Sequence, residues 1–501
     1  MSLRMNPSLL AALAAAALAA GCAGTGPTKA ADTLYIGGDI VTVDDQQPKA
    51  EAVAVKDGKI VAVGTRAEVE RGFKGSATKT VDLQGKTLLP GFIDAHSHFI
   101  DSLAMADRAN VSSPPVGPAK NPAEVAAVLQ AFAKARGIEP GELVIGWGYD
   151  DTLMPPGQRV DRDLLDQAFP DNPVVIVHTT MHGAVLNSKG FAKFGLKDGM
   201  ATPPGGVIVR KPGTQDLQGL VMEAAYLPVV SNLPGTTPAT EVEAARKGQM
   251  IYAAAGITTA QDGATHAPQV AQLQRIARQG GLFIDVVAYP FVTDVKTVLA
   301  DNPAPTWGRY EQRLKIGGCK LTVDGSPQAK TAWFTTPYLT GGPNGEKDWK
   351  GNPVMPPPEM HDAIKLCYDN HLQMLLHGNG DAAIDFLIEA HVKAAGADPT
   401  RDRRTVGIHS QFIRPDQLVK YKEYHIVPAL FTLHTYFFYD THVLNRGPQQ
   451  AGAISPIKTA MEMGMRPTNH TDYAVTPIDQ MLMLWSAVNR ISRKGVLNGA
   501  D

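Results

Sequence analysis

Apolar and polar residues alternate along the first part of the chain, between residues 32 and 89. The segments with this period of two are LYIGGDIVTV, EAVAVKDGKIVAVG and TKTVDLQGKTLLP. Successive side chains of a β-strand point to opposite faces, so the pattern predicts strands with one covered face. The Asp57-Gly58 pair between two such runs is a strong signal for a tight hairpin. We therefore predict a small antiparallel β unit at residues 32–89, which forms part of a β-sandwich.

From residue 90 onward, short apolar runs alternate with longer segments of helical character, which is the pattern of parallel βα units. Ten runs have the composition of buried strands: GFIDAH, LVIGWGY, PVVIVH, GITTAQDG, FIDVVAYPF, KIGGCKLTVDG, LQMLLHG, TVGIHS, IVPALFTLH and RPTNHTDYA. A (βα)8 barrel of the TIM type needs only eight. LVIGWGY and PVVIVH lie in a proline-rich stretch without a regular strand–helix rhythm, so we assign them to an inserted domain. The predicted fold class is α/β, with a barrel at residues 90–99 and 239–501 and the insertion at 100–238, after barrel strand 1.

The N-terminus predicts export from the cytoplasm. Arg4 is followed by an alanine- and leucine-rich run, Leu9–Ala20, which is too short to span a bilayer and matches the core of a signal peptide. The sequence LAAGC resembles a bacterial lipobox, which implies that residues 1–21 are removed and that Cys22 becomes a lipidated first residue. Cleavage by the general signal peptidase is the alternative, because alanine stands where leucine is usual. Residues 22–31 would then be a flexible tether, in the periplasm or at a membrane of a bacterial envelope.

Composition narrows the class of protein. Of the 501 residues, 44% are hydrophobic and 19% are charged, as in a folded globular protein. The formal net charge of −2 gives no electrostatic reason to expect nucleic acid or a polybasic contact with lipid. Besides Cys22 the chain has Cys319 and Cys367, and one possible pair does not make a disulfide framework. We predict that both are buried thiols that pack as small apolar side chains.

Candidate metal ligands lie at the ends of the predicted barrel strands. His96 and His98 follow strand 1 and are two residues apart, so both imidazoles can point to the same side. Neutral imidazoles are good ligands for zinc and similar divalent ions. With the insertion set aside, polar residues also fall on strand 4 and close strands 5, 6 and 8: Lys320, His377, His409 and Asp472. Catalytic residues of a barrel gather at this C-terminal rim, so their order predicts one metal site rather than scattered histidines.

This order of residues resembles that of the metal-dependent amidohydrolase superfamily. The motifs GWGYDDT, HTTMHGAVLNS, PPGGVIVR, KLTVDGS, LHTYFFYDTH and TDYAVTPID are similar to its YtcJ-like branch, amidohydrolase family 3, which includes N-substituted formamide deformylase. The resemblance implies that the metal is bound by His96, His98, His377 and His409. It also implies that Lys320 is carboxylated and completes a site for one or two ions of Zn²⁺ or a similar divalent metal.

Two features leave alternatives open. Lys320 could instead pair with Asp324 or reach solvent, in which case Glu223 would be the substitute carboxylate ligand. The chain also ends early relative to the family pattern, in which further residues would follow Asp501 and complete the β unit begun at Asp32. We therefore expect a C-terminally incomplete barrel and open strand edges in the β unit.

The expected chemistry is hydrolysis by an activated water. A bound divalent ion lowers the pKa of water and polarises a carbonyl oxygen. Asp472 beside the ion would stay ionised, accept the proton of the water and pass it to the leaving amine. As an alternative, Asp472 is an ordinary turn or N-cap residue. Weaker candidates for contact with the substrate or the ligands are His178, His182, Trp147, Glu223, Asp324, His434, Asp440, His442 and His470.

Three functions remain open from the sequence. The first is hydrolysis of a non-peptide C–N bond in a small amide-like molecule, by an exported or lipid-anchored enzyme. The second is a catalytically impaired or non-catalytic envelope lipoprotein that keeps the fold. The third is a deaminase or lactonase with the same site. We expect the first, with a small molecule and no nucleic acid as the partner, and we leave homo-oligomer formation open.

Overall fold

The computed structural model describes residues 30–114, 116–179, 183–203, 206–342, 346–499 and 501, apart from the side chains of residues 152 and 223. The predicted signal peptide, Cys22 and most of the tether therefore lie outside the described residues. The chain divides into two compact units, with the boundary between Gly91 and Phe92. Among the described helices, none combines the length and the apolar character that crossing a membrane requires.

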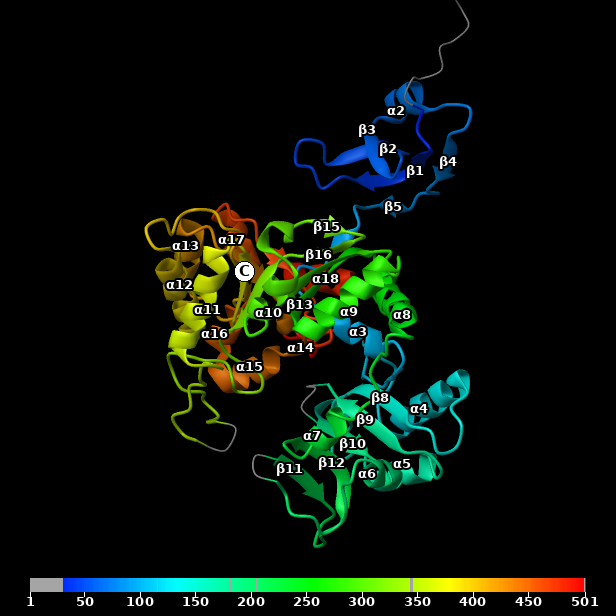
Figure 1. Ribbon diagram of the computed structural model, residues 1–501, viewed down its shortest axis with the longest axis vertical. Helices are drawn as coiled ribbons and strands as arrows, with labels where there is room; N and C mark the ends of the chain where they lie inside the picture. Colours follow the sequence, from blue (N-terminus) through cyan, green and yellow to red (C-terminus); the bar gives the residue numbers. More distant parts are fainter. Residues whose placement is uncertain (1–29, 115, 180–182, 204–205, 343–345, 500) are drawn as a thin grey trace, which may run out of the picture. The chain divides into compact units, whose positions relative to one another are not determined.

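The first unit is a small sheet with one helix packed on it. Its elements are β1 (Thr33–Val41), β2 (Lys49–Lys56), β3 (Lys59–Gly64), α2 (Arg66–Phe73), β4 (Lys79–Asp82) and β5 (Thr87–Leu88) (Figure 1). The predicted hairpin at Asp57-Gly58 joins β2 to β3, and both turn residues have positive φ, as a type I′ turn requires. Val69 of α2 belongs to one apolar cluster with Leu34 and Ile36 of β1.

The prediction of a purely antiparallel unit is wrong for the last two strands. β2 pairs with β1 in antiparallel fashion, but β4 and β5 pair with β1 in parallel. Helix α2 carries the chain back along the sheet, so β4 starts from the same end as β1. The period of two in the sequence does not encode strand direction, because side chains alternate in the same way in parallel and antiparallel sheets.

Eight strands of the second unit form one set, which we call the parallel ring, and five of them carry or directly precede the six candidate residues. In chain order they are β6 (Phe92–Ile93), β13 (Ile257–Thr265), β14 (Asp285–Pro290), β17 (Gly318–Thr322), β18 (Gln373–Gly378), β19 (Val406–His409), β20 (Val427–Leu430) and β21 (Thr468–Asn469). Strands β6, β13 and β14 are parallel neighbours, and so are β17 to β21.

Contacts at two seams close the parallel ring. A parallel bridge between Phe291 and Lys320 joins the β14 side to β17. At the other seam, the N–H of Asp472 donates to the carbonyl oxygen of His96 at 3.0 Å. This order and closure are those expected of a (βα)8 barrel. A short hairpin of β15 (Tyr310–Glu311) and β16 (Leu314–Ile316) extends the sheet beside β14.

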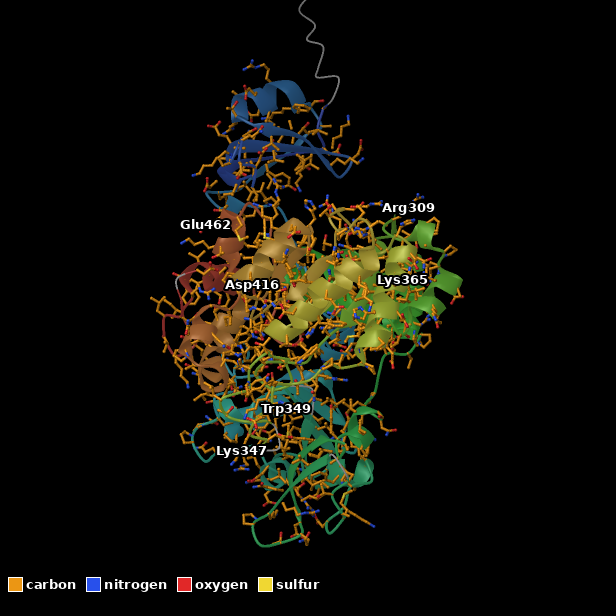
Figure 2. The ribbon with its side chains drawn as sticks, turned by 90° about the vertical axis from the view of Figure 1, so that its left-hand side faces the viewer. Arg309, Lys347, Trp349, Lys365, Asp416 and Glu462 are labelled. Atoms are coloured by element: carbon orange, nitrogen blue, oxygen red, sulfur yellow. A yellow bond between two sulfur atoms is a disulfide. The ribbon has the colours of Figure 1, made fainter. Side chains whose placement is uncertain are left out.

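Helices follow the strands, and several cover the outer side of the ring (Figure 1). They are α8 (Glu241–Ala254), α9 (Ala267–Arg278), α10 (Val295–Asp301), α11 (Pro357–Asp369), α12 (Asp381–Ala395), α13 (Pro415–Glu423), α14 (Leu433–Phe437), α15 (Tyr439–Arg446), α16 (Pro448–Gly452), α17 (Ile457–Glu462) and α18 (Gln480–Asn489). Their apolar faces pack on the strands, as where Ile364 and Leu387 join one cluster with Leu376. Charged side chains such as Lys365 and Asp416 lie on the solvent side of α11 and α13 (Figure 2).

A separate six-stranded sheet occupies the range predicted for the insertion, with the order β11-β12-β10-β9-β8-β7. Its strands are β7 (Ala109–Asn110), β8 (Val144–Tyr149), β9 (Val174–His178), β10 (Gly183–Leu186), β11 (Gly206–Arg210) and β12 (Leu217–Glu223). The helices of this part are α3 (Phe99–Met105), α4 (Pro122–Arg136), α5 (Arg162–Ala168), α6 (Ser188–Lys193) and α7 (Leu227–Val230). LVIGWGY and PVVIVH form β8 and β9, so these two runs lie outside the parallel ring.

Cys319 and Cys367 form a disulfide, so the prediction of two separate buried thiols is wrong. Cys319 lies on β17 directly before Lys320, and Cys367 lies in the last turn of α11. Both are fully buried, and their Cα atoms are 6.6 Å apart, within the range that a disulfide spans. The sequence spacing could not reveal the bond, because the two cysteines meet only through the packing of α11 on β17.

Candidate metal centre

Six polar residues converge where the strands of the parallel ring end, and they are the six that the sequence placed there. They line a common cavity of about 770 Å³ and are His96, His98, Lys320, His377, His409 and Asp472. The two histidines of the HxH motif follow β6, and the aspartate follows β21 across the seam of the ring. Ligand-type atoms of His96, His98 and Asp472 all lie within 4.8 Å of one another.

Asp472 lies at the centre of this group. Its Oδ1 is 3.2 Å from His98 Nε2 and 3.5 Å from His96 Nε2, and its Oδ2 is 3.9 Å from His409 Nε2. The residue is 6% exposed, and its Oδ1 makes no hydrogen bond with any described residue. A buried carboxylate oxygen without a hydrogen bond is unfavourable, and a cation held between the carboxylate and the imidazoles would satisfy it. The residues present therefore fit a divalent metal ion.

The charge states of Asp472, His96 and His409 suit metal binding. Burial disfavours the ionised form of Asp472, but the contact with His98 outweighs burial and lowers its pKa, so the carboxylate stays ionised. Burial also lowers the pKa of His96 and of His409 well below the usual value, which keeps both imidazoles neutral. Neutral imidazole and ionised carboxylate are the forms that bind a metal ion.

Neighbouring side chains fix the direction of two imidazoles. Gln261, on β13, accepts a hydrogen bond from His96 Nδ1 through its Oε1 at 2.9 Å, which leaves the Nε2 lone pair of His96 facing Asp472. His470 Nε2 lies 2.9 Å from His409 Nδ1, so the Nε2 of His409 also faces the centre. Partners of this kind set the tautomer and orientation of metal-binding histidines.

Asp324 holds the segment that directly follows His377 and β18. The Asp324 side chain is fully buried and accepts hydrogen bonds from the backbone N–H of Trp333 and of the Asn379-Gly380 pair, at 2.8 to 2.9 Å. His377 Nδ1 lies 3.4 Å from Asp324 Oδ1. Asp324 therefore supports the end of β18, and it makes no ion pair with Lys320 among the contacts of the described residues.

Lys320 is buried beside the first histidine. Its Nζ lies 3.1 Å from His96 Nε2, and the residue is 2% exposed. Burial lowers the pKa of Lys320 to about 8. A larger fraction of this amine is therefore neutral at neutral pH than for a lysine in water.

His434 is one weaker candidate that the structure brings to the metal cavity. It lines that cavity and is buried, and its Nδ1 lies 3.0 Å from His442 Nε2 in a nearly parallel stack of the two rings. His470 is also close to the centre, through its contact with His409. His434 can therefore contact a molecule in the cavity, and His470 can orient His409.

The other weaker candidates that the structure describes lie elsewhere. His178 ends β9 of the inserted sheet, and its Nε2 is 3.2 Å from Asp151 Oδ1. Asp440 lies 3.6 Å from Lys494 at the surface. Trp147, on β8, packs its ring against Tyr473 rather than lining the metal cavity. His182 and the side chain of Glu223 lie outside the described residues.

Sequence reasoning missed Gln261 and Thr471. Thr471 donates its N–H to Asp94 Oδ1 at 3.1 Å and its hydroxyl to Asp94 Oδ2, which fastens the end of β21 to the segment after β6. Burial raises the pKa of Asp94 to about 7. The polar Gln-Asp pair in GITTAQDG was an available signal for Gln261. His442 was a weaker candidate for the substrate pocket, but its contact with His434 could not be predicted, because it depends on how α15 packs next to α14.

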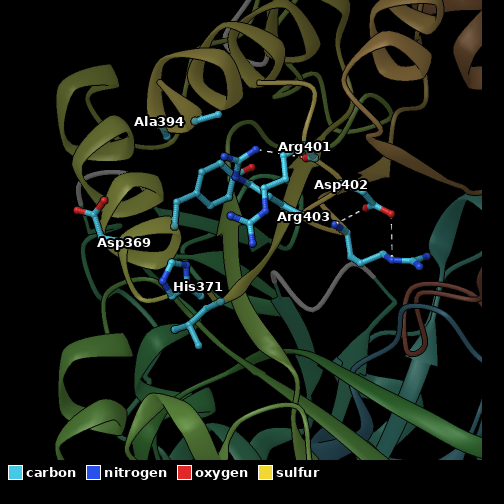
Figure 3. A pocket seen from close by; sticks show the side chains of 10 residues that line it. Asp369, His371, Ala394, Arg401, Asp402 and Arg403 are labelled. Carbon is cyan, nitrogen blue, oxygen red and sulfur yellow. Dashed lines mark hydrogen bonds and ion pairs between the residues drawn. The ribbon is translucent and has the colours of Figure 1, made fainter. Parts of the chain in front are cut away.

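A hollow at the opposite ends of β18 and β19, where these strands begin, has a different chemistry (Figure 3). It encloses about 640 Å³ and is rich in arginine. Arg404 Nε lies 3.3 Å from Asp402 Oδ2, and Arg403 donates to the carbonyl oxygen of Asp398 at 2.6 Å. His371 is its one histidine among the described lining residues, so this hollow does not offer a set of metal ligands.

The described architecture and site define a metal-dependent hydrolase of the α/β class. Residues 79–501 match the family model described as the amidohydrolase family, which is well over half of the chain. The chain therefore belongs to the amidohydrolase family, and it is a hydrolase that acts on carbon–nitrogen bonds other than peptide bonds. The similarity to the YtcJ-like branch, expected from the motifs, is confirmed.

Two relatives match nearly the whole chain. Protein LONG AFTER FAR-RED 3 of Arabidopsis thaliana is 26% identical over 479 residues, which cover 93% of this chain and 79% of that protein. N-substituted formamide deformylase of Arthrobacter pascens is 24% identical over 484 residues, which cover 93% and 85%. The crystal structure of an uncharacterized metal-dependent hydrolase from Pyrococcus horikoshii has a TM-score of 0.68, 22% identity, and coverage of 91% of this chain and 86% of that one. At this identity the likeness concerns the fold alone.

Proposed function

We propose that this protein hydrolyses a non-peptide C–N bond of a small amide-like molecule at a divalent metal ion, zinc or a similar ion, on a (βα)8 barrel. The observation that carries the proposal is the buried Asp472 Oδ1, which lies between the Nε2 atoms of His96 and His98 and has no hydrogen bond within the described part of the chain. The relative named N-substituted formamide deformylase supports an amide-like substrate.

The ligand set would be His96, His98, His377 and His409, with Lys320 as a carbamate. The ion would supply a water of lowered pKa and would polarise the carbonyl of the substrate. The burial of Lys320 supports the carbamate, because the neutral amine is the form that adds carbon dioxide, and its pKa of about 8 makes that form accessible. The carbamate would also replace a buried cation beside His96 with an anion that suits the metal.

Asp472 would be the general base. Its carboxylate would take one proton from the attacking water and deliver it to the nitrogen of the leaving amine, so that the C–N bond breaks without expelling an amide anion. The lowered pKa of Asp472 means that the base is ready in its ionised form over the neutral pH range. Its position 3.2 to 3.9 Å from three imidazoles supports this role, because a base beside those ligands would be near the bound water.

His434 would donate a hydrogen bond to the substrate. Burial lowers the pKa of both His434 and His442, so both rings are neutral and share one N–H between them. His442 Nδ1 is buried and has no hydrogen-bond partner among the described residues. A buried N–H without an acceptor is rare, so the proton of His442 belongs on Nε2, where it is donated to His434 Nδ1. His434 then carries its own proton on Nε2, available to an oxygen or nitrogen acceptor in the cavity.

The test compares Asp472→Asn and His96→Ala with the wild type. Metal content is measured by atomic emission, and turnover is measured on a panel of N-formyl and N-acyl amines. We expect Asp472→Asn to keep its metal and to lose about 10²- to 10⁴-fold in kcat, the usual contribution of a general base. We expect His96→Ala to lose its metal.

Three results would contradict this function in different ways. Near-wild-type kcat in Asp472→Asn would remove Asp472 from the role of base. Turnover of lactones or aminated heterocycles, but of no amide, would favour the deaminase or lactonase. A metal-free wild-type protein without any turnover would favour a non-catalytic envelope lipoprotein.

We also propose that the protein works outside the cytoplasm, as a periplasmic or lipid-anchored protein. The buried Cys319–Cys367 disulfide supports this location, because such bonds persist mainly in oxidising compartments. Fractionation of a bacterium that expresses the full chain tests the proposal. Membrane association that is lost in Cys22→Ala would support the anchor, and recovery of the protein in the cytoplasm would contradict export.

A further inference from the structure

A second cavity adjoins the segment that follows Asp472. It encloses about 460 Å³ and, among the described lining residues, shares none with the metal cavity. Its walls come from the residues that follow α3, from the inserted sheet, from α8 and from the residues around Tyr473. We call it the Trp147 pocket, because it contains the tryptophan of the GWGYDDT motif, which the metal site leaves unused.

Large apolar side chains form one wall of the Trp147 pocket. The rings of Trp147 and Tyr473 meet edge to face, with centroids 6.1 Å apart and an angle of 89° between their planes. Met250, which is 53% exposed, and Ile478 complete this wall. Two aromatic rings and two aliphatic chains in one concave wall suit a compact apolar body rather than a sugar or another polar molecule.

Positive charge forms the other wall. Arg108 and Arg246 line the pocket, and the guanidinium group of neither makes a hydrogen bond or an ion pair with another described residue. Lys247 also lines it, but its Nζ donates to Asp107 Oδ1 at 2.9 Å, so its charge is already paired. None of the described lining residues is acidic. Asp101 attracts the charge of Arg108 without a hydrogen bond. Burial lowers the pKa of Arg108, as expected for a buried cation whose guanidinium group lacks a partner.

From this arrangement we infer that the Trp147 pocket binds a small organic carboxylate with an aromatic or branched apolar body. The carboxylate would accept hydrogen bonds from the guanidinium groups of Arg108 and Arg246, which match its planar, two-oxygen geometry. The apolar body would lie against Trp147 and Tyr473. An amphiphilic anion satisfies both walls at once, whereas inorganic phosphate would leave the apolar wall uncovered and a neutral hydrocarbon would leave the cations unpaired.

The pocket is linked to the metal centre through Tyr473. This residue directly follows Asp472, and its carbonyl oxygen accepts a hydrogen bond from the N–H of His98 at 2.7 Å. A molecule in the Trp147 pocket would therefore touch Tyr473. The backbone of Tyr473 contacts the proposed ligand His98 and follows the proposed base Asp472. The binding inference itself rests on the pocket and holds whether or not the proposed reaction is correct.

The experiment is calorimetric titration of the metal-loaded full chain with 4-phenylbutyrate, and with 4-phenylbutanol as its neutral counterpart. Arg246→Gln tests the pocket with an exposed side chain that can be replaced without disturbing the core. Arg108→Gln tests the half-buried partner. Arg71→Gln, on the exposed surface of α2, is the control for the loss of one positive charge. Metal content and thermal unfolding of each variant show that it is folded.

We expect the carboxylate to bind and the alcohol to bind at least about tenfold more weakly. We expect Arg246→Gln to lower the affinity for the carboxylate by about tenfold, because one charge-assisted hydrogen bond is lost. Arg71→Gln should bind as the wild type does. Because a carboxylate can also bind a metal ion, the titration is repeated after removal of the metal. Binding that vanishes with the metal and is unchanged in Arg246→Gln would overturn the proposal, and so would equal binding of the acid and the alcohol.

Discussion

His442 should make the protein lose stability on acidification, and the size of the loss follows from its burial. The residue is fully buried, its Nε2 lies 3.0 Å from His434 Nδ1, and burial lowers its pKa from the usual 6.5 to about 3. Between these two values the folded protein keeps His442 neutral, while the unfolded chain binds a proton at this position. The unfolded state is therefore favoured as the pH falls through 6.5, and the effect is absent at higher pH.

Each pH unit below the unfolded pKa is worth about 1.4 kcal/mol for one such group. Acidification from pH 7.5 to pH 5 crosses about 1.5 units of this range, so His442 should reduce the free energy of unfolding by about 2 kcal/mol. Other buried neutral histidines act in the same direction in the wild type. A variant at His442 alone isolates the contribution of this one residue.

Urea unfolding at pH 7.5 and at pH 5 measures the effect in the wild type, in His442→Gln and in His425→Gln. Glutamine keeps a nitrogen near the position of Nε2 but does not titrate. We expect the difference in unfolding free energy between the two pH values to be smaller by about 2 kcal/mol in His442→Gln than in the wild type. His425 is exposed, so its variant should follow the wild type. The same pH dependence in His442→Gln and in the wild type would refute the reasoning.

Two further predictions concern Lys320 and the disulfide. In Lys320→Ala, metal content and turnover should fall, and short carboxylic acids should restore part of both if a carbamate is the native ligand; full metal content without any additive would contradict the carbamate. The double variant Cys319→Ala with Cys367→Ala should lose about 2 to 4 kcal/mol of stability, because the bond closes a loop between cysteines 48 positions apart. An unchanged thermal unfolding temperature would show that the bond does not constrain the unfolded chain.

The ends of the ring strands could be predicted because two independent patterns agree there. Apolar runs of strand length located β18 and β19, and each run ends in one histidine, His377 or His409, with a polar segment after it. Setting aside LVIGWGY and PVVIVH moved Lys320 onto the fourth strand of the ring, and the structure places those two runs in a different sheet. Strand position alone therefore brought the six candidate residues to one rim.

Contacts between elements could not be predicted in the same way. Gln261 reaches His96 from the neighbouring strand, and His442 reaches His434 from the next helix, so each contact depends on strand register or helix packing. The Cys319–Cys367 bond has the same origin. A pattern within one element gives the face on which a side chain lies, but it does not say which residue of another element faces it.

The seam between β21 and β6 both closes the parallel ring and positions three residues of the site. The N–H of Asp472 bonds to His96 O, and the N–H of His98 bonds to Tyr473 O, so the two histidines and the aspartate are positioned by the same pair of backbone contacts that joins the last strand to the first. Thr471 adds a side-chain link to Asp94 across this seam. If the ring opened there, the proposed base would separate from the HxH motif even though no ligand had changed. Metal binding by residues on both sides should therefore hold the seam closed. A change that lowers the stability of the ring should also lower metal binding, and removal of the metal should lower the stability of the ring.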